Sequence, residues 1–309
     1  MSPARTKLPA WLKKRLPPEG KTAPVSSLLT ELRLGTVCRE AHCPNMGECF
    51  ARGTATFMIL GRTCTRACTF CAVGHGTPEA PDPDEPRRIA EAVRRLKLRH
   101  VVVTSVTRDD LPDGGSGHFA ETVRVVHEGT TATVEVLTPD FGGRPADLDR
   151  VLDSRPEVFN HNVETVPRLY PEVRPQADYA RSLGVLARAS ASTHRPVTKS
   201  GLMLGLGEME EEVRGVLDDL RQAGCCVVTL GQYLAPSAAH HPVVEFVSPE
   251  RFEALGALAL KMGFQAVACG PFVRSSYGAE AIAARVLALR VGSFGTDARA
   301  AARDRYEDG

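Results

Sequence analysis

The sequence predicts an α/β fold built on a parallel β-sheet. Apolar runs typical of buried strands alternate along the chain with stretches whose apolar residues recur at helical spacing, and this alternation favours parallel strand–helix units. The length of 309 residues suits either two domains or one barrel. Hydrophobic residues make up 43% of the chain and charged residues 24%, as in ordinary soluble globular proteins.

The predicted elements follow one another from residue 54 onward. Short apolar runs predict strands at residues 56–60, 100–106, 133–137, 158–164, 199–206, 226–233 and 265–270. Apolar residues at helical spacing predict helices between these strands at residues 83–98, 118–128, 144–153, 176–189, 209–224 and 248–263. Asp84 is the expected N-cap of the first of these helices, because a carboxylate there can accept a backbone N–H bond.

The chain before residue 54 has a different character. Residues 26–34 predict one short helix, whereas residues 1–24 predict an extended arm that is rich in lysine, arginine and proline. We expect Trp11, the only tryptophan, to anchor this arm on the body of the protein.

Charge and hydropathy exclude several classes of protein. With 38 basic and 37 acidic residues the formal net charge is +1, so a basic nucleic-acid binder is not expected. No uninterrupted apolar run approaches the roughly 18 residues of a membrane span, so no membrane association is expected. The N-terminus lacks the apolar core of a secretion signal, and we expect the protein in the cytoplasm, where thiols stay reduced.

The cysteines are the most informative residues of the sequence. Six of the nine fall within residues 38–71. An odd number of cysteines in a chain of this length argues against a framework of disulfides, and clustered cysteines in a reducing compartment usually bind metal or take part in catalysis. Ligand sites of parallel sheets lie beyond the carboxyl ends of the strands, so the loops after the predicted strands are where we expect the chemistry.

The second cysteine triplet directly follows the first predicted strand. It has the spacing Cys-x3-Cys-x2-Cys and consists of Cys64, Cys68 and Cys71. Iron–sulfur clusters prefer soft thiolate ligands, and three thiolates would hold three irons of a 4Fe–4S cluster. A structural zinc site with His75 as fourth ligand is the alternative. The cluster is favoured because this spacing after a strand resembles the signature of radical S-adenosylmethionine (SAM) enzymes, in which SAM binds the fourth iron.

The first cysteine triplet has four and then five intervening residues, and it consists of Cys38, Cys43 and Cys49. Pro44 disfavours a regular helix at this place and indicates a loop. A zinc site with His42 as fourth ligand is one interpretation. The other is a second 4Fe–4S cluster, called the auxiliary cluster below, which three thiolates would hold.

Two such clusters create a shortage of ligands, because six cysteines leave one iron of each cluster without a thiolate. SAM would complete one cluster. The other needs a ligand that is not a cysteine, or one of the three remaining thiols. Those thiols lie in strand-like runs and are interpreted as ordinary buried residues; they are Cys225, Cys226 and Cys269.

The two triplets together resemble the lipoyl synthase family, and the resemblance covers nearly the whole chain. It includes the segments TVCREAHCPNMGEC, TATFMILGRTCTRACTFCAV, TSVTRDDLPDGGSGHF, EVLTPDF, FNHNVETVPRLYPEVRP, TKSGLMLGLGE, LGQYLAPS and GPFVRSSY. In that family the first serine of RSSY ligates the auxiliary cluster, and the resemblance assigns this role to Ser275. Without the resemblance, these four residues would be more typical of the start of a helix.

The resemblance also implies an architecture. It implies an α/β fold with a radical SAM partial (β/α)6 parallel barrel at residues 54–270. An N-terminal extension at residues 1–53 would carry the auxiliary-cluster motif, and a C-terminal segment at residues 271–309 would close the site. The implied cofactors are two 4Fe–4S clusters and SAM, and the implied catalytic residues are Cys64, Cys68, Cys71 and Ser275.

The implied reaction inserts two sulfur atoms, at C6 and C8 of an octanoyl chain carried on a lysine, and draws the sulfur from the auxiliary cluster. Those methylenes have no acidic proton, and general acid–base catalysis accelerates a reaction by only about 10²–10⁴-fold, which cannot break such C–H bonds. A radical derived from a cofactor must therefore do the chemistry. The implied partners are octanoylated lipoyl carrier domains (the glycine cleavage H protein and E2 subunits of 2-oxoacid dehydrogenases), an electron donor and a protein that rebuilds the auxiliary cluster.

Polar and glycine residues after other predicted strands are candidates for binding SAM. Asp110 and Asp113 follow the second strand, where radical SAM enzymes commonly bind the methionyl amine, and Glu164 could bind the ribose or the amino group. Gly205 and Gly207 could let the backbone approach a cofactor at the start of a helix. Each candidate has a structural alternative. The two aspartates could simply belong to a polar loop, Glu164 to a hydrogen-bond network inside the barrel, and the two glycines to a turn between a strand and a helix.

Three other classes of protein share part of this pattern. A different radical SAM sulfur-inserting enzyme, such as a methylthiotransferase, would usually carry an appended RNA-binding or other domain. An electron-transfer protein with two clusters would need neither a barrel-sized body nor an open iron. A structural zinc protein would differ at once in its metal content.

Overall fold

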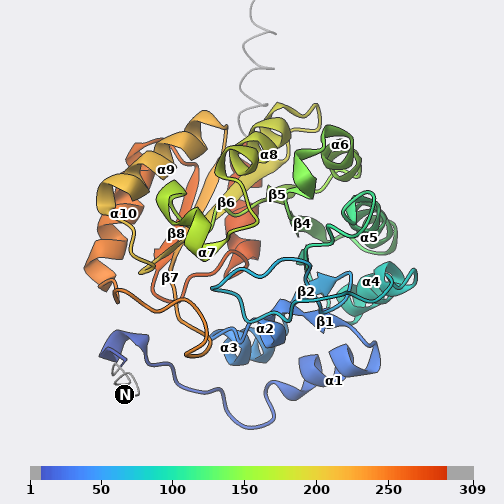
Figure 1. Cartoon of the computed structure of the whole chain (residues 1–309). Coiled ribbons are helices and arrows are strands. Elements are labelled where there is room, and N and C mark those ends of the chain that lie inside the picture. The colour runs from blue at the N-terminus through green and yellow to red at the C-terminus, as the bar shows by residue number, and fades with distance from the viewer. Residues whose placement is uncertain (1–7, 291–309) are drawn as a thin grey trace, which may run out of the picture.

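One β-sheet organises the residues that the computed structural model describes, 8–290 (Figure 1). Its eight strands follow the order of the chain, and all neighbouring strands are parallel except the first pair. The strands are β1 (Gly35–Thr36), β2 (Thr56–Ile59), β3 (His100–Ser105), β4 (Thr133–Leu137), β5 (Val158–Asn160), β6 (Val197–Leu204), β7 (Val227–Gln232) and β8 (Ala266–Gly270). Within the described ranges no ladder joins β8 back to β2, so the barrel is partial.

Helices follow the parallel strands and pack on the outside of the sheet. Six strand–helix units lead from β2 to α10, and β8 follows them, which confirms the predicted α/β class. The helices of these units are α4 (Glu85–Arg95), α5 (Ser116–Gly129), α6 (Pro145–Asp153), α8 (Tyr179–Ala191), α9 (Glu210–Gln222) and α10 (Pro249–Lys261). Shorter elements on the way are η2 (Phe141–Gly143), η3 (Pro167–Leu169) and α7 (Tyr170–Val173).

The apolar faces of these helices form the core together with the strands. Ile89 and Val93 of α4 and Phe119 of α5 are at most 1% exposed and pack in one cluster with β2 to β4. A second cluster joins β6 and β7 to α9 and α10. Burying each such side chain stabilises the fold by roughly 1.5–3 kcal/mol.

The segment before the barrel carries β1 and four short helical elements, which lie along one side of the barrel (Figure 1). They are η1 (Ala10–Leu12), α1 (Ala23–Glu31), α2 (Val37–Glu40) and α3 (Met46–Ala51). The predicted anchor of the arm was wrong: Leu12 is buried, whereas Trp11 is 41% exposed. β1 pairs with β2, so the segment is joined to the sheet itself.

The strand predicted over residues 158–164 is too long, because β5 ends at Asn160. His161 N still donates to Lys199 O of β6 at 3.1 Å, but Val163 N donates to the Ser200 hydroxyl at 3.3 Å and not to a backbone carbonyl. Glu164 rejoins the sheet through an isolated bridge to Leu202, with a φ of 64° that L-residues seldom adopt. This break turns the side chains after β5 toward the carboxyl end of the barrel.

The amino end of the barrel is closed by a last helix over residues 279–290. Its Ala283 and Val286 pack against the first residues of β5 to β8, which are Val158, Val197, Val227 and Ala266. The predicted C-terminal segment runs on to residue 309, and residues 291–309 lie outside the described part, as do residues 1–7 of the predicted extension. None of the helices within residues 8–290 is long and apolar enough to cross a membrane.

A buried ion pair crosses the interior of the barrel. Lys199 on β6 donates to both oxygens of Glu135 on β4, at 2.8 and 3.1 Å, and both side chains are 1% exposed. Asn160 on β5 donates to the same carboxylate at 3.0 Å. Burial by itself would raise the pKa of Glu135, but the charge of Lys199 and the contact with His100 hold that pKa well below its ordinary value.

We expect Lys199→Met to destabilise the protein by about 3–5 kcal/mol, because it leaves the Glu135 carboxylate buried without its cation. Urea unfolding followed by circular dichroism, on wild type and variant prepared in the same cluster state, measures the loss. The double variant Lys199→Met/Glu135→Gln is the control and should lose less, since no buried charge remains unpaired. Equal losses in the single and the double variant would contradict this account.

Candidate active site between two cysteine loops

A cavity of about 510 Å³ opens at the carboxyl ends of the strands. Both cysteine loops and the C-terminal segment contribute to its walls. The cysteines and serines among its lining residues are Cys38, Cys43, Cys64, Cys68, Cys71, Ser105, Ser275 and Ser276. Five of the six cysteines of the two triplets thus line one cavity together with Ser275, whereas Cys49 is not among the lining residues.

The loop Cys64–Cys71, called the second loop below, follows β2 and is fixed to the backbone beyond β3. Thr107 N donates to the Cys64 sulfur at 3.3 Å, and Arg66 N donates to the same sulfur at 3.4 Å. Such N–H donors favour sulfur that carries negative charge, so these bonds suit a thiolate ligand. Thr65 N donates to Thr107 O at 3.0 Å and continues the contact.

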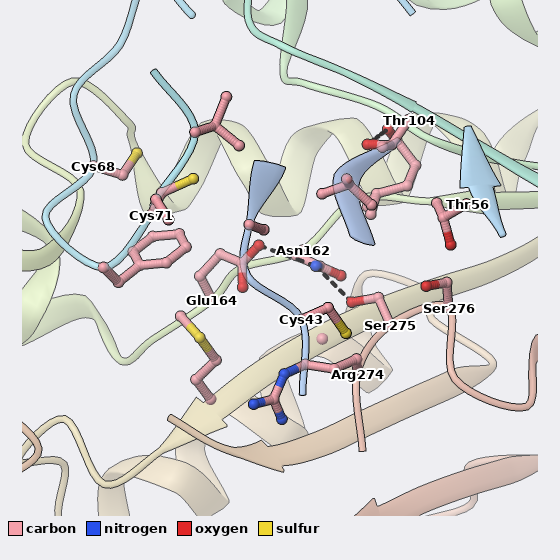
Figure 2. A pocket seen from close by; sticks show the side chains of 18 of the residues that line it. Cys43, Thr56, Cys68, Cys71, Thr104, Asn162, Glu164, Arg274, Ser275 and Ser276 are labelled. Atoms are coloured by element: carbon pink, nitrogen blue, oxygen red, sulfur yellow. Dashed lines mark hydrogen bonds between the residues drawn. The ribbon is translucent and has the colours of Figure 1, made fainter. Parts of the chain in front are cut away.

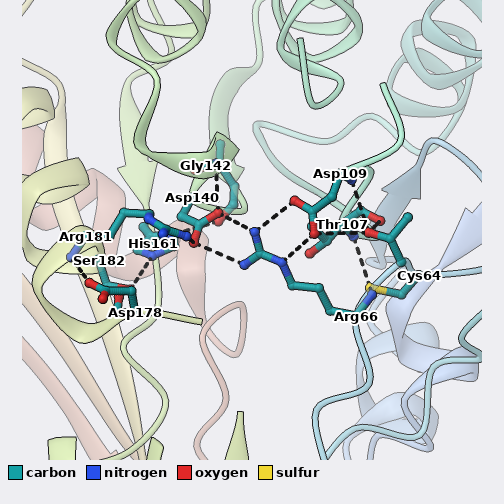
Figure 3. A network of polar contacts seen from close by, with 12 residues as sticks. Cys64, Arg66, Thr107, Asp109, Asp140, Gly142, His161, Asp178, Arg181 and Ser182 are labelled. Atoms are coloured by element: carbon teal, nitrogen blue, oxygen red, sulfur yellow. Dashed lines mark hydrogen bonds and ion pairs between the residues drawn. The ribbon is translucent and has the colours of Figure 1, made fainter. Parts of the chain in front are cut away.

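Arg66 ties the second loop to the ends of two strands (Figure 3). Its guanidinium donates to Asp109 beyond β3 at 2.7 and 2.9 Å, and to Asp140 beyond β4 at 2.8 and 3.0 Å. Burial alone would raise the pKa of Asp140, but hydrogen bonds from Arg66 and its charge hold that pKa well below its ordinary value. The sequence analysis missed Arg66 and its two carboxylate partners. The position of an arginine between two clustered cysteines was a visible signal for Arg66.

The far end of the second loop is held from the opposite side of the barrel. Thr69 N donates to Val173 O of α7 at 3.0 Å, and Ala67 N donates to Oε1 of Gln176 at 2.7 Å. His241 N donates to Thr69 O at 2.9 Å. The loop is therefore fixed at both ends, so its three sulfurs have a preset arrangement.

The sulfurs of the second loop lie where a free thiolate would be unfavourable. Burial raises the pKa of the Cys71 thiol to about 12, and burial also raises the pKa of Cys68, although the charge of Arg174 opposes that effect. Bound iron would offset this cost, because thiols that coordinate a metal ion are deprotonated. The donor set thus fits a 4Fe–4S cluster.

Zinc would place a stricter demand on these residues. In residues 8–290, no three His, Cys, Asp or Glu side chains converge to hold a single metal ion. A structural zinc site needs four ligands that converge on one ion. In a four-iron cluster each cysteine binds a different iron, so its ligands need not converge on one point.

The loop Cys38–Cys49, called the auxiliary loop below, contains α2 and the start of α3. Thr36 caps α2 by accepting a bond from Cys38 N at 3.2 Å, and Cys43 N donates to Cys38 O at 3.1 Å. Burial raises the pKa of Cys49 to about 12, and the nearby Cys38 and Cys43 add to that effect. The three thiols thus act on one another electrostatically, and a cluster would relieve the cost of their ionisation as it would in the second loop.

Ser275 reaches the cavity from the C-terminal segment, beside the auxiliary loop (Figure 2). Its Oγ accepts a bond from Asn162 Nδ2 at 2.7 Å, and the same Nδ2 donates to Glu164 at 3.0 Å. Gly201 makes room for this meeting, since a Cβ there would lie 2.9 Å from the Ser275 oxygen and 2.7 Å from Asn162 Oδ1. The sequence analysis missed Asn162, which falls inside the strand predicted at residues 158–164, although β5 ends two residues before it.

Charged side chains lie between the two cysteine loops. Burial raises the pKa of Glu164, although Arg174 opposes that effect. Arg174 donates to the carbonyl oxygens of Asn162 and Val163, both at 3.0 Å, while its buried Nε has no hydrogen-bond partner in the described residues. Burial also lowers the pKa of Arg274, which precedes Ser275. The charges of two guanidinium groups thus act on one buried acid, and an anionic ligand would be favoured here.

The other predicted cofactor residues lie away from these walls. Asp110 forms an ion pair with Arg108 at 2.8 Å and is 36% exposed, and Asp113 accepts bonds from Gly115 N and Gly117 N at the start of α5. Glu208 accepts bonds from the backbone N–H groups of Gly205 and Leu206. The lining residues include neither aspartate and neither Gly205 nor Gly207, and their binding of SAM stays a prediction.

The three remaining cysteines lie in the sheet or at its edges, but of the three only Cys225 is buried, whereas Cys226 and Cys269 are partly exposed. Cys225 donates to Val227 O at 3.2 Å, beside the amino end of β7, and Cys226 is its neighbour. Cys269 of β8 donates to Phe252 O at 2.9 Å. None of the three is among the lining residues of the cavity.

Comparisons with known proteins agree with this geometry. Residues 58–220 match the family model of the Radical SAM superfamily. The chain is 57% identical to a protein named lipoyl synthase from Trichlorobacter lovleyi over 273 residues, which is 88% of this chain and 96% of that one. It is 54% identical to a protein of the same name from Chlorobium limicola over 282 residues, or 91% of this chain and 96% of the relative.

Solved structures share the fold at low sequence identity. Methylornithine synthase superposes with a TM-score of 0.50 at 14% identity, over 79% of this chain and 81% of the other. Streptococcus suis SuiB bound to S-adenosylmethionine superposes with a TM-score of 0.54 at 10% identity, over 72% of this chain and 54% of the other. The structures support the architecture, and the relatives support the finer grouping. The chain therefore belongs to the lipoyl synthase family of the Radical SAM superfamily.

Proposed function

We propose that this protein inserts two sulfur atoms, at C6 and C8 of an octanoyl chain attached to a lysine of a carrier protein, and thereby forms the lipoyl group. The observation that carries the proposal is the meeting of both cysteine loops and Ser275 at one cavity. One set of ligands suits SAM cleavage, and the other suits a source of sulfur.

In this proposal Cys64, Cys68 and Cys71 hold a 4Fe–4S cluster whose fourth iron takes SAM. Cys38, Cys43, Cys49 and Ser275 hold the auxiliary cluster, which serves as the sulfur donor. When bound, these cofactors supply one-electron chemistry that can break an unactivated C–H bond and deliver sulfide to the carbon. The division of the chain at residues 53/54 and 270/271 into an extension, a barrel and a closing segment belongs to the same proposal.

The protein's own residues supply binding and orientation. Met58, Phe70, Leu137 and Met203 are among the apolar residues that line the cavity, and they suit a saturated chain that gains about 0.8 kcal/mol for each buried methylene. Arg66 orients the second loop through its carboxylate pairs. Apolar walls also exclude water, which protects a reactive site from side reactions.

The substrate we propose is an octanoylated lipoyl carrier domain, such as the glycine cleavage H protein or an E2 subunit of a 2-oxoacid dehydrogenase. The protein would also need an electron donor, and a second protein would have to rebuild the auxiliary cluster after it has given up sulfide. These partners follow from the proposed chemistry, because reductive cleavage consumes electrons and sulfur transfer consumes the cluster.

We predict that Cys68→Ala abolishes SAM cleavage and lowers the iron content by about half, because one cluster of two is lost. Anaerobic iron analysis and chromatography of 5′-deoxyadenosine measure the two effects. Cys269→Ala is the matched control, since this thiol lies away from the cavity, and it should keep both. A Cys68→Ala chain that still forms 5′-deoxyadenosine at the wild-type rate would refute the assignment.

We predict that Ser275→Cys keeps the auxiliary cluster but impairs sulfur transfer more than SAM cleavage. A thiolate binds iron more strongly than the hard serine oxygen, so the fourth bond would open less readily. Ser275→Ala should give a labile cluster, and Ser276→Ala is the neighbouring control and should be tolerated better. Normal lipoyl formation by Ser275→Ala, followed by mass spectrometry of the product peptide, would show that another group has the role.

We predict that free octanoate is a poor substrate and that an octanoyl-lysyl peptide is a good one. The apolar walls bind the alkyl chain in both cases, but only the peptide can fix the direction in which the chain enters. Turnover of the two compounds, measured by mass spectrometry under the same reducing conditions, compares them. Equal turnover would count against a substrate bound to a carrier.

A further inference from the structure

Lys14 lies where three distant segments of the chain meet. Its ammonium donates to Asn45 Oδ1 at 2.5 Å and to Glu48 Oε2 at 2.6 Å, both in the segment that holds Cys43 and Cys49. The same nitrogen lies 4.7 Å from the ring centroid of Phe272 and 5.1 Å from that of Tyr277. One side chain of the N-terminal arm thus contacts the auxiliary loop and both flanks of Ser275.

The two outer segments also bind each other around this lysine. Asn45 Nδ2 donates to Phe272 O at 2.7 Å, and the Tyr277 hydroxyl donates to Glu48 Oε1 at 2.8 Å. Asn45 is 1% exposed and uses both ends of its amide, one for Lys14 and one for Phe272. Glu48 likewise uses both oxygens: Oε2 accepts from Lys14, while Oε1 accepts from Tyr277 and also pairs with Arg52 at 2.7 Å. The lysine therefore completes a closed ring of contacts.

The arm is seated so that Lys14 reaches this place. Leu12 is buried, while Lys13 is exposed. Pro17 lies directly on α3, because a Cβ at Gly47 would come within 2.9 Å of the proline Cδ. Packing on both sides of Lys14 therefore fixes its backbone beside the auxiliary loop.

The chemistry of these contacts makes the lysine hard to replace. Its ammonium forms a charge-assisted hydrogen bond to a carboxylate, and it lies beside two aromatic rings, whose faces attract cations. A neutral side chain of the same length would keep the packing but lose both attractions. Through these contacts the Lys14 Nζ atom joins the arm to the auxiliary loop and to the C-terminal segment.

We propose that Lys14 is a positioning residue that fastens the C-terminal segment to the auxiliary loop and so holds Ser275 beside Cys38, Cys43 and Cys49. This rests on the proposed function, in which Ser275 is the fourth ligand of the auxiliary cluster. Lys14 donates no hydrogen bond to any of these four residues; it acts through the residues on either side of Ser275. Without it the segment would separate from the loop more often, and the iron that Ser275 binds would be reached sooner by a chelator.

The test uses the full chain with Cys64, Cys68 and Cys71 replaced by Ala, so that the auxiliary triplet alone holds a cluster. After anaerobic reconstitution, the rate of iron transfer to a ferrous chelator is measured. Lys14→Met should speed this transfer roughly fivefold or more, as expected for the loss of a charge-assisted contact. Lys14→Arg should restore most of the parent's rate, and Lys13→Met, the exposed neighbour, should match the parent.

A second measurement does not depend on iron. Hydrogen exchange of peptides that cover residues 271–277 in the cluster-free wild-type chain should become faster in Lys14→Met and stay unchanged in Lys13→Met. Tyr277→Phe keeps the ring but removes the bond to Glu48, and it should change both measurements in the same direction by less. This variant keeps the proposal testable if Lys14→Met does not fold.

Three results would overturn the proposal in distinguishable ways. If Lys14→Met matches Lys13→Met in iron transfer and in hydrogen exchange, the fastening role is wrong while the ligand assignment stands. If Ser275→Ala in the same background holds iron as firmly as the parent, the ligand assignment fails, and the positioning role fails with it. If the parent itself retains no iron, the auxiliary cluster of the proposed function is wrong.

Discussion

The cavity depends on one buried guanidinium, that of Arg66. It lies between two carboxylates that follow neighbouring parallel strands, and so it fixes the second loop relative to the sheet. The side chain of Asp140 is 1% exposed, and Arg66 holds it with two hydrogen bonds while Arg181 pairs with it at 3.3 Å. Arg66 lies between Cys64 and Cys68 in the sequence, and its ion pairs therefore also fix where the sulfurs of these two cysteines lie.

The inside of the barrel is shaped to receive the end of the chain. Gly201 and Gly231 lie on the neighbouring strands β6 and β7, and a Cβ at Gly231 would approach Val273 O to 2.1 Å. Any larger residue at these positions would displace the backbone that carries Ser275. The strands therefore provide the space, Asn162 provides a hydrogen bond, and the auxiliary loop provides the neighbouring wall.

The sequence predicted the parts of this structure that local pattern encodes. Apolar runs located seven of the strands, and the spacing of the cysteines predicted which loops would carry the site. The length of β5 was wrong because Val163 continues the apolar pattern of Val158 and Phe159, yet Val163 N donates to the Ser200 hydroxyl at 3.3 Å and not to a backbone carbonyl. Asp84 does precede its helix, although its side chain makes no capping bond.

The contacts that the sequence could not predict join residues that are far apart in the chain. Arg66 and Asp140 are separated by 74 positions, and Asn162 and Ser275 by 113. Nothing in the local composition distinguishes Lys14 from its exposed neighbours Lys13 and Arg15, or indicates that Leu12 rather than Trp11 would be buried. Only the folded chain shows which charge of a basic segment has partners.

The closing helix at residues 279–290 limits how far Ser275 can travel. That helix packs under the barrel, and β8 is hydrogen-bonded to β7, so the stretch between them is tethered at both ends. Ala279 follows Ser275 by four positions, and a fully extended chain of that length reaches only about 13–14 Å. A serine that left its place would therefore remain within reach of the cavity and could return to it without any rearrangement of the barrel.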